Sequence, residues 1–321
     1  PIGPNKEKAM AFSIFVSLAA AGGIIFLLEQ LQSGGLDVAA IERRLGIPYI
    51  CGVPNWAEAT KEFKKKKSRI LVTQDKSDVP TEVYRTLRTS VEYSVDGQTP
   101  YALLVTSGLE KAGKTMTTLN LAIATSWTGK KVLLVDGDLR RGVLHKELRI
   151  KPEKGGFAEV LKGSVHDWRQ VVLSTEYDNL DLLPAGKYTH DLPELLGTAQ
   201  LQRLVDEWRS AYDLVLIDSA PVSLVVDSAS LARVCDGTLI VINHENASVN
   251  DIRHASHRLG SSNILGFCLN NIEMPKRRYG YSRYGYYGRH YGQYYYYPYA
   301  YHKYEHYSAV GDSENDKDKE G

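Results

Sequence analysis

From residue 100 onward, short apolar runs alternate with stretches in which apolar residues recur every three or four positions. The apolar runs have the length of β-strands and cover residues 101–106, 131–135, 179–183, 214–217, 237–242 and 264–269. The stretches between them have helical periodicity and cover residues 114–128, 157–161, 199–212, 228–234 and 248–259. Nearly continuous apolar strands that alternate with helices are typical of a mostly parallel sheet with helices on both faces. The pattern therefore predicts an α/β domain, which we place at residues 79–275, with a first helix at 81–91 and Thr81 as its N-cap.

The pattern is different before residue 79. Residues 9–28, AMAFSIFVSLAAAGGIIFLL, contain no charged side chain, and a helix of this length spans about 30 Å, the thickness of a bilayer core. We therefore predict a transmembrane helix within residues 1–30; a buried core helix or the apolar part of a signal sequence is the alternative. Residues 31–78 are expected to form a juxtamembrane segment and a linker, with one short strand near 46–54. The basic run KEFKKKKSR at 61–69 indicates that this side of the helix lies in the cytoplasm, either against lipid or as a solvated linker.

Residues 276–321 have a composition that no packed core uses. Between residues 279 and 307 the chain contains many Tyr, Gly, Arg and His residues but no Val, Ile, Leu or Phe. Such a segment cannot bury enough apolar surface to fold, so we expect a disordered, tyrosine-rich tail. Its tyrosines are Tyr279, Tyr281, Tyr284, Tyr286, Tyr287, Tyr291, Tyr294, Tyr295, Tyr296, Tyr297, Tyr299, Tyr301, Tyr304 and Tyr307.

Charge and cysteine content exclude some classes of function. The net charge is +1, so the chain as a whole offers no electrostatic basis for binding nucleic acid. The Arg, Gly and Tyr residues of RRYGYSRYGYYGRHYG leave RNA binding by base stacking as an alternative for this segment. Cys51, Cys235 and Cys268 are far apart in the sequence, which is typical of a reducing compartment and favours neither a disulfide framework nor a zinc site.

Gly108–Thr115, GLEKAGKT, matches the phosphate-binding loop pattern G-x-x-x-x-G-K-[ST] and lies between a predicted strand and a predicted helix. The backbone N–H groups of such a loop and the helix N-terminus supply partial positive charge to phosphates. Lys114 is expected to reach the β- and γ-phosphates, and Thr115 is expected to ligate Mg²⁺. The residues expected to bind ATP are Gly108, Ala112, Gly113, Lys114, Thr115 and Met116.

Three carboxylates follow two further strands. Asp136 and Asp138 come at the end of the strand in VDGDLR, and Asp218 ends the strand in LIDSAP. Ligands of open α/β sheets bind at the carboxyl ends of the strands, which favours a functional site over solvated loop carboxylates. Asp218 is the expected Mg²⁺ partner of Thr115. We expect Asp136 to orient or deprotonate an incoming hydroxyl and Asp138 to assist Mg²⁺ coordination, although these two roles could be reversed.

Together, GLEKAGKT, VDGDLR and LIDSAP resemble the Walker A, Walker A′ and Walker B motifs of the bacterial tyrosine kinases. The segment with Glu82, Arg85 and Arg88 resembles the E-x-x-R-x-x-R oligomerisation motif of that family. The stretch GGFAEVLKG and the tyrosine-rich tail also resemble family sequence. Upstream, the apolar segment and LGIPYICGVP resemble the second transmembrane helix of a polysaccharide co-polymerase and its exit.

The resemblance implies a P-loop NTPase-type fold and a protein-tyrosine kinase that uses ATP and Mg²⁺ and phosphorylates its own tail. Lys114, Asp136 and Asp138 would be its catalytic residues, and Glu82, Arg85 and Arg88 would hold a homo-oligomeric ring together. The family location implied is the bacterial inner membrane, with the kinase domain in the cytoplasm. The implied partners are a tyrosine phosphatase and the machinery of exopolysaccharide or capsule polymerisation and export, which the kinase would regulate. A first transmembrane helix and a periplasmic domain would precede this sequence.

The chain departs from the family pattern at two places. The family loop commonly reads Pro-Gly-Glu where this chain has Glu110, Lys111 and Ala112, and Gly142 replaces the usual Pro after the double arginine. Lys111 lacks the conformational freedom of glycine. The alternative class is a membrane-tethered partition or septum-positioning ATPase without a protein substrate. Those proteins carry a lysine directly after the first loop glycine, where this chain has Leu109, so the sequence favours the kinase.

Overall fold

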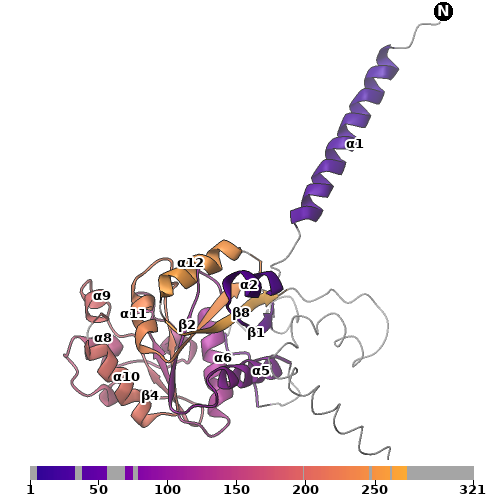
Figure 1. Cartoon of the computed structure of the whole chain (residues 1–321). Helices are drawn as coiled ribbons and strands as arrows, with labels where there is room; N and C mark the ends of the chain where they lie inside the picture. Colours follow the sequence, from indigo (N-terminus) through magenta and orange to yellow (C-terminus); the bar gives the residue numbers. More distant parts are fainter. Residues whose placement is uncertain are drawn as a thin grey trace, which may run out of the picture.

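The computed structural model describes residues 6–32, 38–55, 69–74, 79–197, 199–245, 248–260 and 262–272 (Figure 1). The strands are β1 (Tyr49–Pro54), β2 (Tyr101–Thr106), β3 (Val132–Asp136), β4 (Leu173–Ser174), β5 (Leu180–Leu183), β6 (Leu214–Asp218), β7 (Gly237–Asn243) and β8 (Ile264–Ile272). The helices are α1 (Lys6–Gln32), α2 (Val38–Leu45), α5 (Val79–Ser94), α6 (Lys114–Ser126), α7 (Leu144–Glu147), α8 (Phe157–Leu161), the 3₁₀ helix η1 (Trp168–Gln170), α9 (Leu192–Leu195), α10 (Ala199–Ala211), α11 (Asp227–Val234) and α12 (Val249–Leu259).

The strands form one sheet in the order β1-β8-β7-β2-β6-β3-β5-β4. Every neighbouring pair is parallel except β4 and β5, which are antiparallel. Strand β2, which leads into the phosphate-binding loop, lies between β6 and β7 near the middle of the sheet. The predicted parallel sheet with helices on both faces is therefore confirmed (Figure 1).

Two hydrophobic cores lie on opposite faces of the sheet, because successive strand side chains point to opposite faces. In β2, Ala102 and Leu104 join one core, whereas Leu103 and Val105 join the other. Helices α8, α10, α11 and α12 cover the first core, and α5, α6 and α7 cover the second. Burial on both faces explains why the strands read as unbroken apolar runs in the sequence.

The sheet begins earlier in the chain than the expected boundary at residue 79. Strand β1 had been assigned to the juxtamembrane segment, but it pairs in parallel with β8 and all its residues are buried. Its partner strand lies more than 200 residues away in the chain, so local sequence pattern could not reveal the pairing. The short antiparallel strand β4 was also missed, because two residues are too few to show a period.

Several of the predictions concern segments that lie outside the described residues. These include most of the basic run at 61–69 and the whole tail from residue 276 to 321. Helix α1 covers the apolar segment 9–28. Over the residues whose side chains are described, no helix is both long enough and apolar enough to cross a membrane.

Residues 69–74 lie against α6 and are held there by one buried side chain, Asn120. Its Oδ1 accepts hydrogen bonds from the N–H groups of Leu71 at 2.7 Å and Val72 at 3.1 Å, and its Nδ2 donates to the carbonyls of Arg69 and Met116. Asn120 is fully buried, and these four bonds use the whole capacity of its amide.

Thr81 is not the N-cap that the sequence predicted, because α5 already begins at Val79. Its hydroxyl instead accepts a bond from the Thr73 N–H at 2.9 Å and lies 3.2 Å from the Thr73 carbonyl. Thr81 therefore joins the start of α5 to the segment that Asn120 holds against α6.

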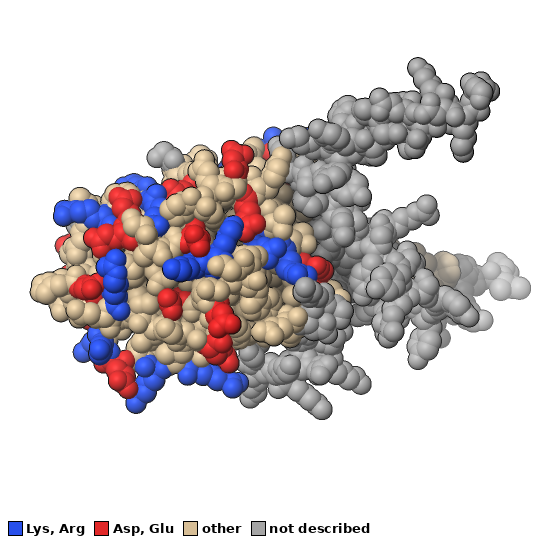
Figure 2. Space-filling model, turned by 90° about the horizontal axis from the view of Figure 1, so that it is seen from below, with Lys and Arg blue, Asp and Glu red and all other residues tan. Residues whose placement is uncertain are grey.

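Charged side chains of both signs are interspersed on the face of the domain seen in Figure 2. Exposed ion pairs such as Arg169–Asp167 contribute only about 0–1 kcal/mol each to stability. The two cores and buried polar contacts such as those of Asn120 therefore account for most of the stability of the fold.

We expect the substitution Asn120→Leu to lower the free energy of unfolding by about 2–4 kcal/mol, because it leaves two buried N–H groups and two carbonyls without their partner. Urea unfolding of the full chain measures this effect. Gln202→Leu is the control, because Gln202 is exposed and its amide donates to the exposed Asp206, and its cost should stay within about 0.5 kcal/mol. A cost below about 1 kcal/mol for Asn120→Leu would contradict the anchoring role.

Candidate active site

The loop between β2 and α6 has the backbone shape of a phosphate-binding loop. Its last glycine, Gly113, has a φ of +92°, and a Cβ there would lie 1.8 Å from Asn270 Nδ2. Glycine is therefore required for both conformation and space. The following N–H groups open α6, where the helix dipole and the unpaired N–H groups attract anions. Gly108, at the start of the loop, accepts a hydrogen bond from the Ser223 hydroxyl.

The sequence reasoning missed Asn270, which supports the loop from β8. Its Nδ2 donates to the Ala112 carbonyl at 2.9 Å, and the side chain is 2% exposed. Its Oδ1 has no hydrogen-bond partner among the described residues. The signal for Asn270 was present in the sequence, because two adjacent Asn residues interrupt the otherwise apolar strand β8.

Asp218 lies buried at the end of β6 and contacts the start of α6. Its Oδ2 accepts a hydrogen bond from the Thr115 hydroxyl at 2.7 Å, and its Oδ1 lies 3.3 Å from the Thr118 hydroxyl. Burial raises the pKa of Asp218 to about 6, against the opposing charge of Lys114. Burial also lowers the pKa of Lys114, which the charges of Asp218 and Asp138 oppose. The structure therefore places Lys114, Thr115 and Asp218 near one another.

Asp136 lies at the end of β3, directly beside Asp218 in the register of the two parallel strands. It is fully buried; its Oδ2 accepts a bond from the Leu144 N–H at 3.0 Å, whereas its Oδ1 has no partner among the described residues. Burial and then the charge of Asp218 raise the pKa of Asp136 to about 8. One carboxyl oxygen is thus held in place, while the other is buried and keeps its hydrogen-bonding capacity unused among the described residues.

Asp138 follows in the turn after β3 and is only partly buried. Its Oδ1 accepts a bond from the Arg141 N–H at 3.0 Å, which fixes the turn. Its charge acts on both Lys114 and Asp218, so it lies near them. Met116 is the last of the residues predicted to bind the nucleotide. It lies in the first turn of α6, where its carbonyl accepts a hydrogen bond from the Asn120 side chain.

The donor set fits a magnesium ion bound together with a nucleotide. Mg²⁺ prefers oxygen ligands and is usually held by one or two protein groups plus substrate phosphates and waters. The Thr115 hydroxyl and the Asp218 carboxylate are such oxygens, 2.7 Å apart. Within the described residues, no group of three or more His, Cys, Asp or Glu side chains is arranged to hold a metal by itself. A metal at this site would therefore depend on phosphate oxygens.

Two ion pairs at the rim of the site were not predicted from the sequence. Arg141 Nη1 lies 2.8 Å from Glu110 Oε1, which joins the loop after β3 to the phosphate-binding loop. Arg140 pairs with the buried Asp227 at 3.5 Å and lies over the ring of Tyr188 at 5.2 Å. Both arginines belong to the double arginine noted in the sequence, but only the fold shows what each one contacts.

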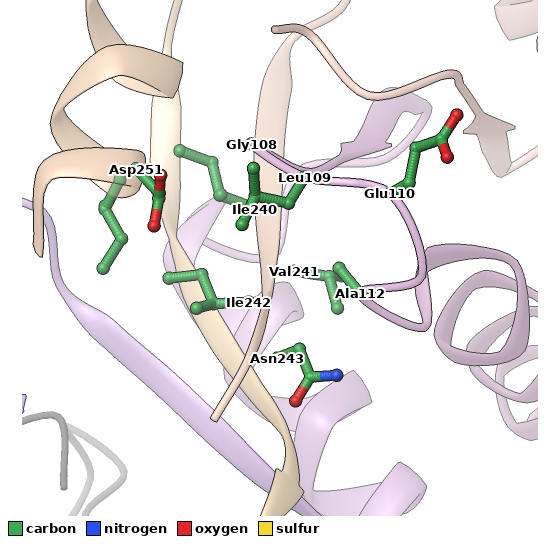
Figure 3. A pocket seen from close by; sticks show the side chains of 10 residues that line it. Gly108, Leu109, Glu110, Ala112, Ile240, Val241, Ile242, Asn243 and Asp251 are labelled. Carbon is green, nitrogen blue, oxygen red and sulfur yellow. The ribbon is translucent and has the colours of Figure 1, made fainter. Parts of the chain in front are cut away.

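A small cavity of about 30 Å³ lies beside the phosphate-binding loop, on the side of β7 and α12 (Figure 3). It holds at most a few water molecules, so it is packing space and not a nucleotide pocket. In Figure 3 the side chain of Glu110 is directed away from this cavity. The lining residues are Gly108, Leu109, Glu110, Ala112, Ile240, Val241, Ile242, Asn243, Asp251 and Ile252.

The residues predicted to mediate oligomerisation lie on α5 and differ in their contacts. Glu82 and Arg85 form an ion pair at 3.3 Å, and their side chains are 58% and 33% exposed. Arg88 instead turns back into its own chain, where its Nη1 donates to the Ala124 carbonyl at 3.0 Å. Carbonyls in the last turn of a helix lack intrahelical partners, so Arg88 caps the end of α6. Its role within the fold was not predicted.

A glycine-containing phosphate-binding loop and strand-end aspartates at the carboxyl edge of a parallel sheet define the P-loop NTPase class. A family profile described as "AAA domain" matches residues 110–261. Tyrosine-protein kinase YwqD of Bacillus subtilis (strain 168) is 33% identical over 228 residues, which are 70% of this chain and 93% of that protein. Tyrosine-protein kinase wzc of Salmonella typhi is 30% identical over 88% of this chain and 40% of that protein.

Among solved structures, the kinase domain of the Escherichia coli tyrosine kinase ETK is 25% identical, with a TM-score of 0.67. The match covers 78% of this chain and 100% of that chain. On the strength of the YwqD match, this chain belongs to the family of the bacterial tyrosine-protein kinases. The chain spans 39% of the length of several other relatives that it matches.

Lys111 offers a test of the backbone geometry, because its φ of +59° lies in the left-handed region. A side chain there costs about 1–2 kcal/mol, whereas glycine adopts this conformation freely. Since glycine also gains entropy in the unfolded chain, we expect Lys111→Gly to raise the melting temperature by a net ~2–4 °C. The control Lys111→Ala removes the charge but keeps a Cβ, and its melting temperature should equal that of the unmodified chain. If the glycine variant melts below the alanine variant, the strain argument is wrong.

Proposed function

We propose that this chain is an ATP-dependent protein-tyrosine kinase that phosphorylates the tyrosine cluster of its own C-terminal tail. The observation that carries the proposal is that a pair of candidate metal-binding oxygens and a candidate base lie side by side at one sheet edge. Thr115 and Asp218 form an oxygen pair beside the phosphate-binding loop, and the neighbouring Asp136 presents a buried oxygen without a partner among the described residues. Membership of the tyrosine-protein kinase family supports the same reaction.

Phosphoryl transfer depends mainly on positioning and on neutralising charge. The N–H groups at the start of α6 and the Lys114 ammonium would hold the phosphates and face the transferred group. Asp136 would accept the proton of the tyrosine hydroxyl on its free Oδ1, while the Leu144 N–H keeps its Oδ2 in place. The tyrosine oxygen then forms the new bond to phosphorus, the bond to the β-phosphate oxygen breaks, and ADP leaves.

Thr115, Asp218 and, directly or through water, Asp138 would hold Mg²⁺, which when bound neutralises phosphate charge. The Thr115 hydroxyl points to Asp218 at 2.7 Å, so both oxygens already face one place. Asp138 is kept near that place by the Arg141 N–H. This arrangement supports the assignment of Asp136 to proton transfer and Asp138 to the metal.

The position of β8 supports the tail as the substrate. Asn270, in β8, bonds to the phosphate-binding loop at Ala112, and the last described residue, Ile272, follows two positions later. Strand β8, which precedes the tail in the sequence, therefore ends at the same sheet edge as the site. A flexible chain of about 30 residues has an end-to-end distance near 30 Å, so it can reach its own site or that of a neighbour. We propose that one subunit of a ring phosphorylates the tail of its neighbour.

The proposal extends to the cellular setting that the family resemblance implies. The kinase would sit at the bacterial inner membrane with the described domain in the cytoplasm, after a transmembrane helix within residues 1–30 and a linker. Phosphorylation of the tail would regulate exopolysaccharide or capsule polymerisation and export, and a tyrosine phosphatase would reverse it. Each phosphate adds about −1.5 to −2 charges, so successive transfers would drive subunits apart.

The substitution Asp136→Asn tests the proposed base. The amide keeps the shape and can still accept the Leu144 N–H, but it cannot take a proton. We therefore expect tail phosphorylation to slow by about 100-fold or more, with nucleotide affinity nearly unchanged. Quantitative mass spectrometry of the full chain with ATP and Mg²⁺ measures the rate. Full activity would exclude the base role, and the same loss in Asp138→Asn alone would assign it to Asp138. Hydrolysis of ATP without phosphotyrosine would instead favour the switch-ATPase class.

The oligomeric ring is tested best at Arg85, because Arg88 is bound within its own fold. We expect Arg85→Glu to dissociate the assembly in analytical ultracentrifugation while the melting temperature changes by less than ~2 °C. The exchange Glu82→Arg with Arg85→Glu restores the ion pair within the helix but keeps the motif reversed, so it should also dissociate. An unchanged sedimentation coefficient in both variants would refute this interface.

A further inference from the structure

An ion pair that the family pattern does not contain joins the phosphate-binding loop to the loop after β3. Glu110 stands where the family loop commonly has Pro, and its carboxylate binds the Arg141 guanidinium at 2.8 Å. The two residues come from the phosphate-binding loop and from the loop after β3, which border the site on two sides. Both are accessible, since their side chains are 45% and 74% exposed.

Glu110 lies close to the place of transfer. Its carboxylate is one of the charges that act on Lys114, the residue that faces the phosphates. Arg141 is anchored next to Asp138, because its N–H bonds to the Asp138 carbonyl at 3.1 Å and to Oδ1 at 3.0 Å. Arg141 thus joins Glu110 to Asp138, and we take the acceptor hydroxyl to reach Asp136 on this side, where the residue next to it in its chain would lie within reach of the Glu110 carboxylate.

The contact with Arg141 shows that this place accepts a guanidinium group. Arg140 does not compete for Glu110, because it is held by Asp227 and lies over Tyr188. A bound phosphate would give Arg141 a second anionic partner and would weaken its hold on Glu110. Glu110 then becomes available to a basic side chain of an incoming segment.

The tail presents basic side chains in a fitting pattern. Tyr279 follows Arg278, Tyr284 follows Arg283, and Tyr304 follows Lys303. Each of these tyrosines can be compared with a nearby tyrosine that is directly preceded by a small uncharged residue. These comparison tyrosines are Tyr281, Tyr286 and Tyr301, respectively. Tyr291 and Tyr307 follow histidine, which is mostly uncharged at neutral pH, and they are left out of the comparison.

We propose that Glu110 is a specificity-determining residue that favours acceptor tyrosines directly preceded by Arg or Lys, and that Arg141 occupies this subsite until such a segment displaces it. The proposal rests on the function proposed above. It divides tail tyrosines that composition alone leaves equivalent into preferred and disfavoured acceptors.

The test measures initial phosphorylation rates at single tyrosines of the full chain, by quantitative mass spectrometry with ATP and Mg²⁺ at pH 7.5. Each rate is divided by that of its partner, in the pairs Tyr279/Tyr281, Tyr284/Tyr286 and Tyr304/Tyr301. We expect ratios of roughly two to five, the size of effect that exposed ion pairs produce. Because each ratio is taken within one molecule, a change in overall activity cancels.

Three variants assign the effect to charge. Glu110→Gln should bring all three ratios to about one, and Glu110→Lys should bring them below one. Adding Arg283→Glu to Glu110→Lys should restore the Tyr284/Tyr286 ratio alone, because the ion pair is rebuilt with reversed signs. The control is Asp167→Asn, which removes a similarly exposed carboxylate paired with Arg169 away from the loop and should leave every ratio unchanged.

Equal rates within all three pairs of the unmodified chain, or ratios unchanged in Glu110→Gln, would overturn this inference while leaving the kinase function intact. Absence of any phosphotyrosine in the tail would overturn the proposed function and the inference together. The two failures are therefore distinguishable in one data set.

Discussion

The site depends on one buried contact, between Asp218 at the end of β6 and the start of α6. The Thr115 and Thr118 hydroxyls both contact this carboxylate, which is 1% exposed, and the charge of Lys114 acts on it. Burial opposes the charge of both Asp218 and Lys114, and each charge partly compensates the other. The pair fixes how α6 meets the sheet, and therefore where the N–H groups of the phosphate-binding loop point.

The remaining carboxylates follow from the parallel alignment of the strands. Asp136 and Asp218 occupy matching positions in β3 and β6, so both reach the carboxyl edge at the same level. Close approach of the two strand ends also needs Gly137, where a Cβ would lie 2.8 Å from the Asp218 carbonyl. Two cores, one on each face, hold this edge rigid, because the strands between them cannot slide without exposing apolar residues.

Sequence reasoning predicted the parts of the fold that local pattern specifies. The six main strands, the phosphate-binding loop and the strand-end aspartates each leave a local signature of apolar runs, glycines or motif spacing. It could not predict the pairing of β1 with β8, which joins the two ends of the domain. It also missed Asn270 and the capping role of Arg88, since these depend on which side chain lies opposite a given carbonyl in space.

The departures from the family loop are linked through the space around Asp136. A Cβ at position 142 would lie 2.4 Å from the Ala185 Cβ and 3.1 Å from Asp136 Oδ2, so only glycine lets this loop pass so close. That close passage brings the Leu144 N–H to Asp136 and sets Arg141 opposite Glu110. Gly142 and Glu110, the two departures, therefore both take part in the path of this loop: the glycine lets it pass close to Asp136, and the carboxylate binds its Arg141. A proline restored at 142 alone would push this loop outward, and it would separate Arg141 from Glu110 as well as Leu144 from Asp136.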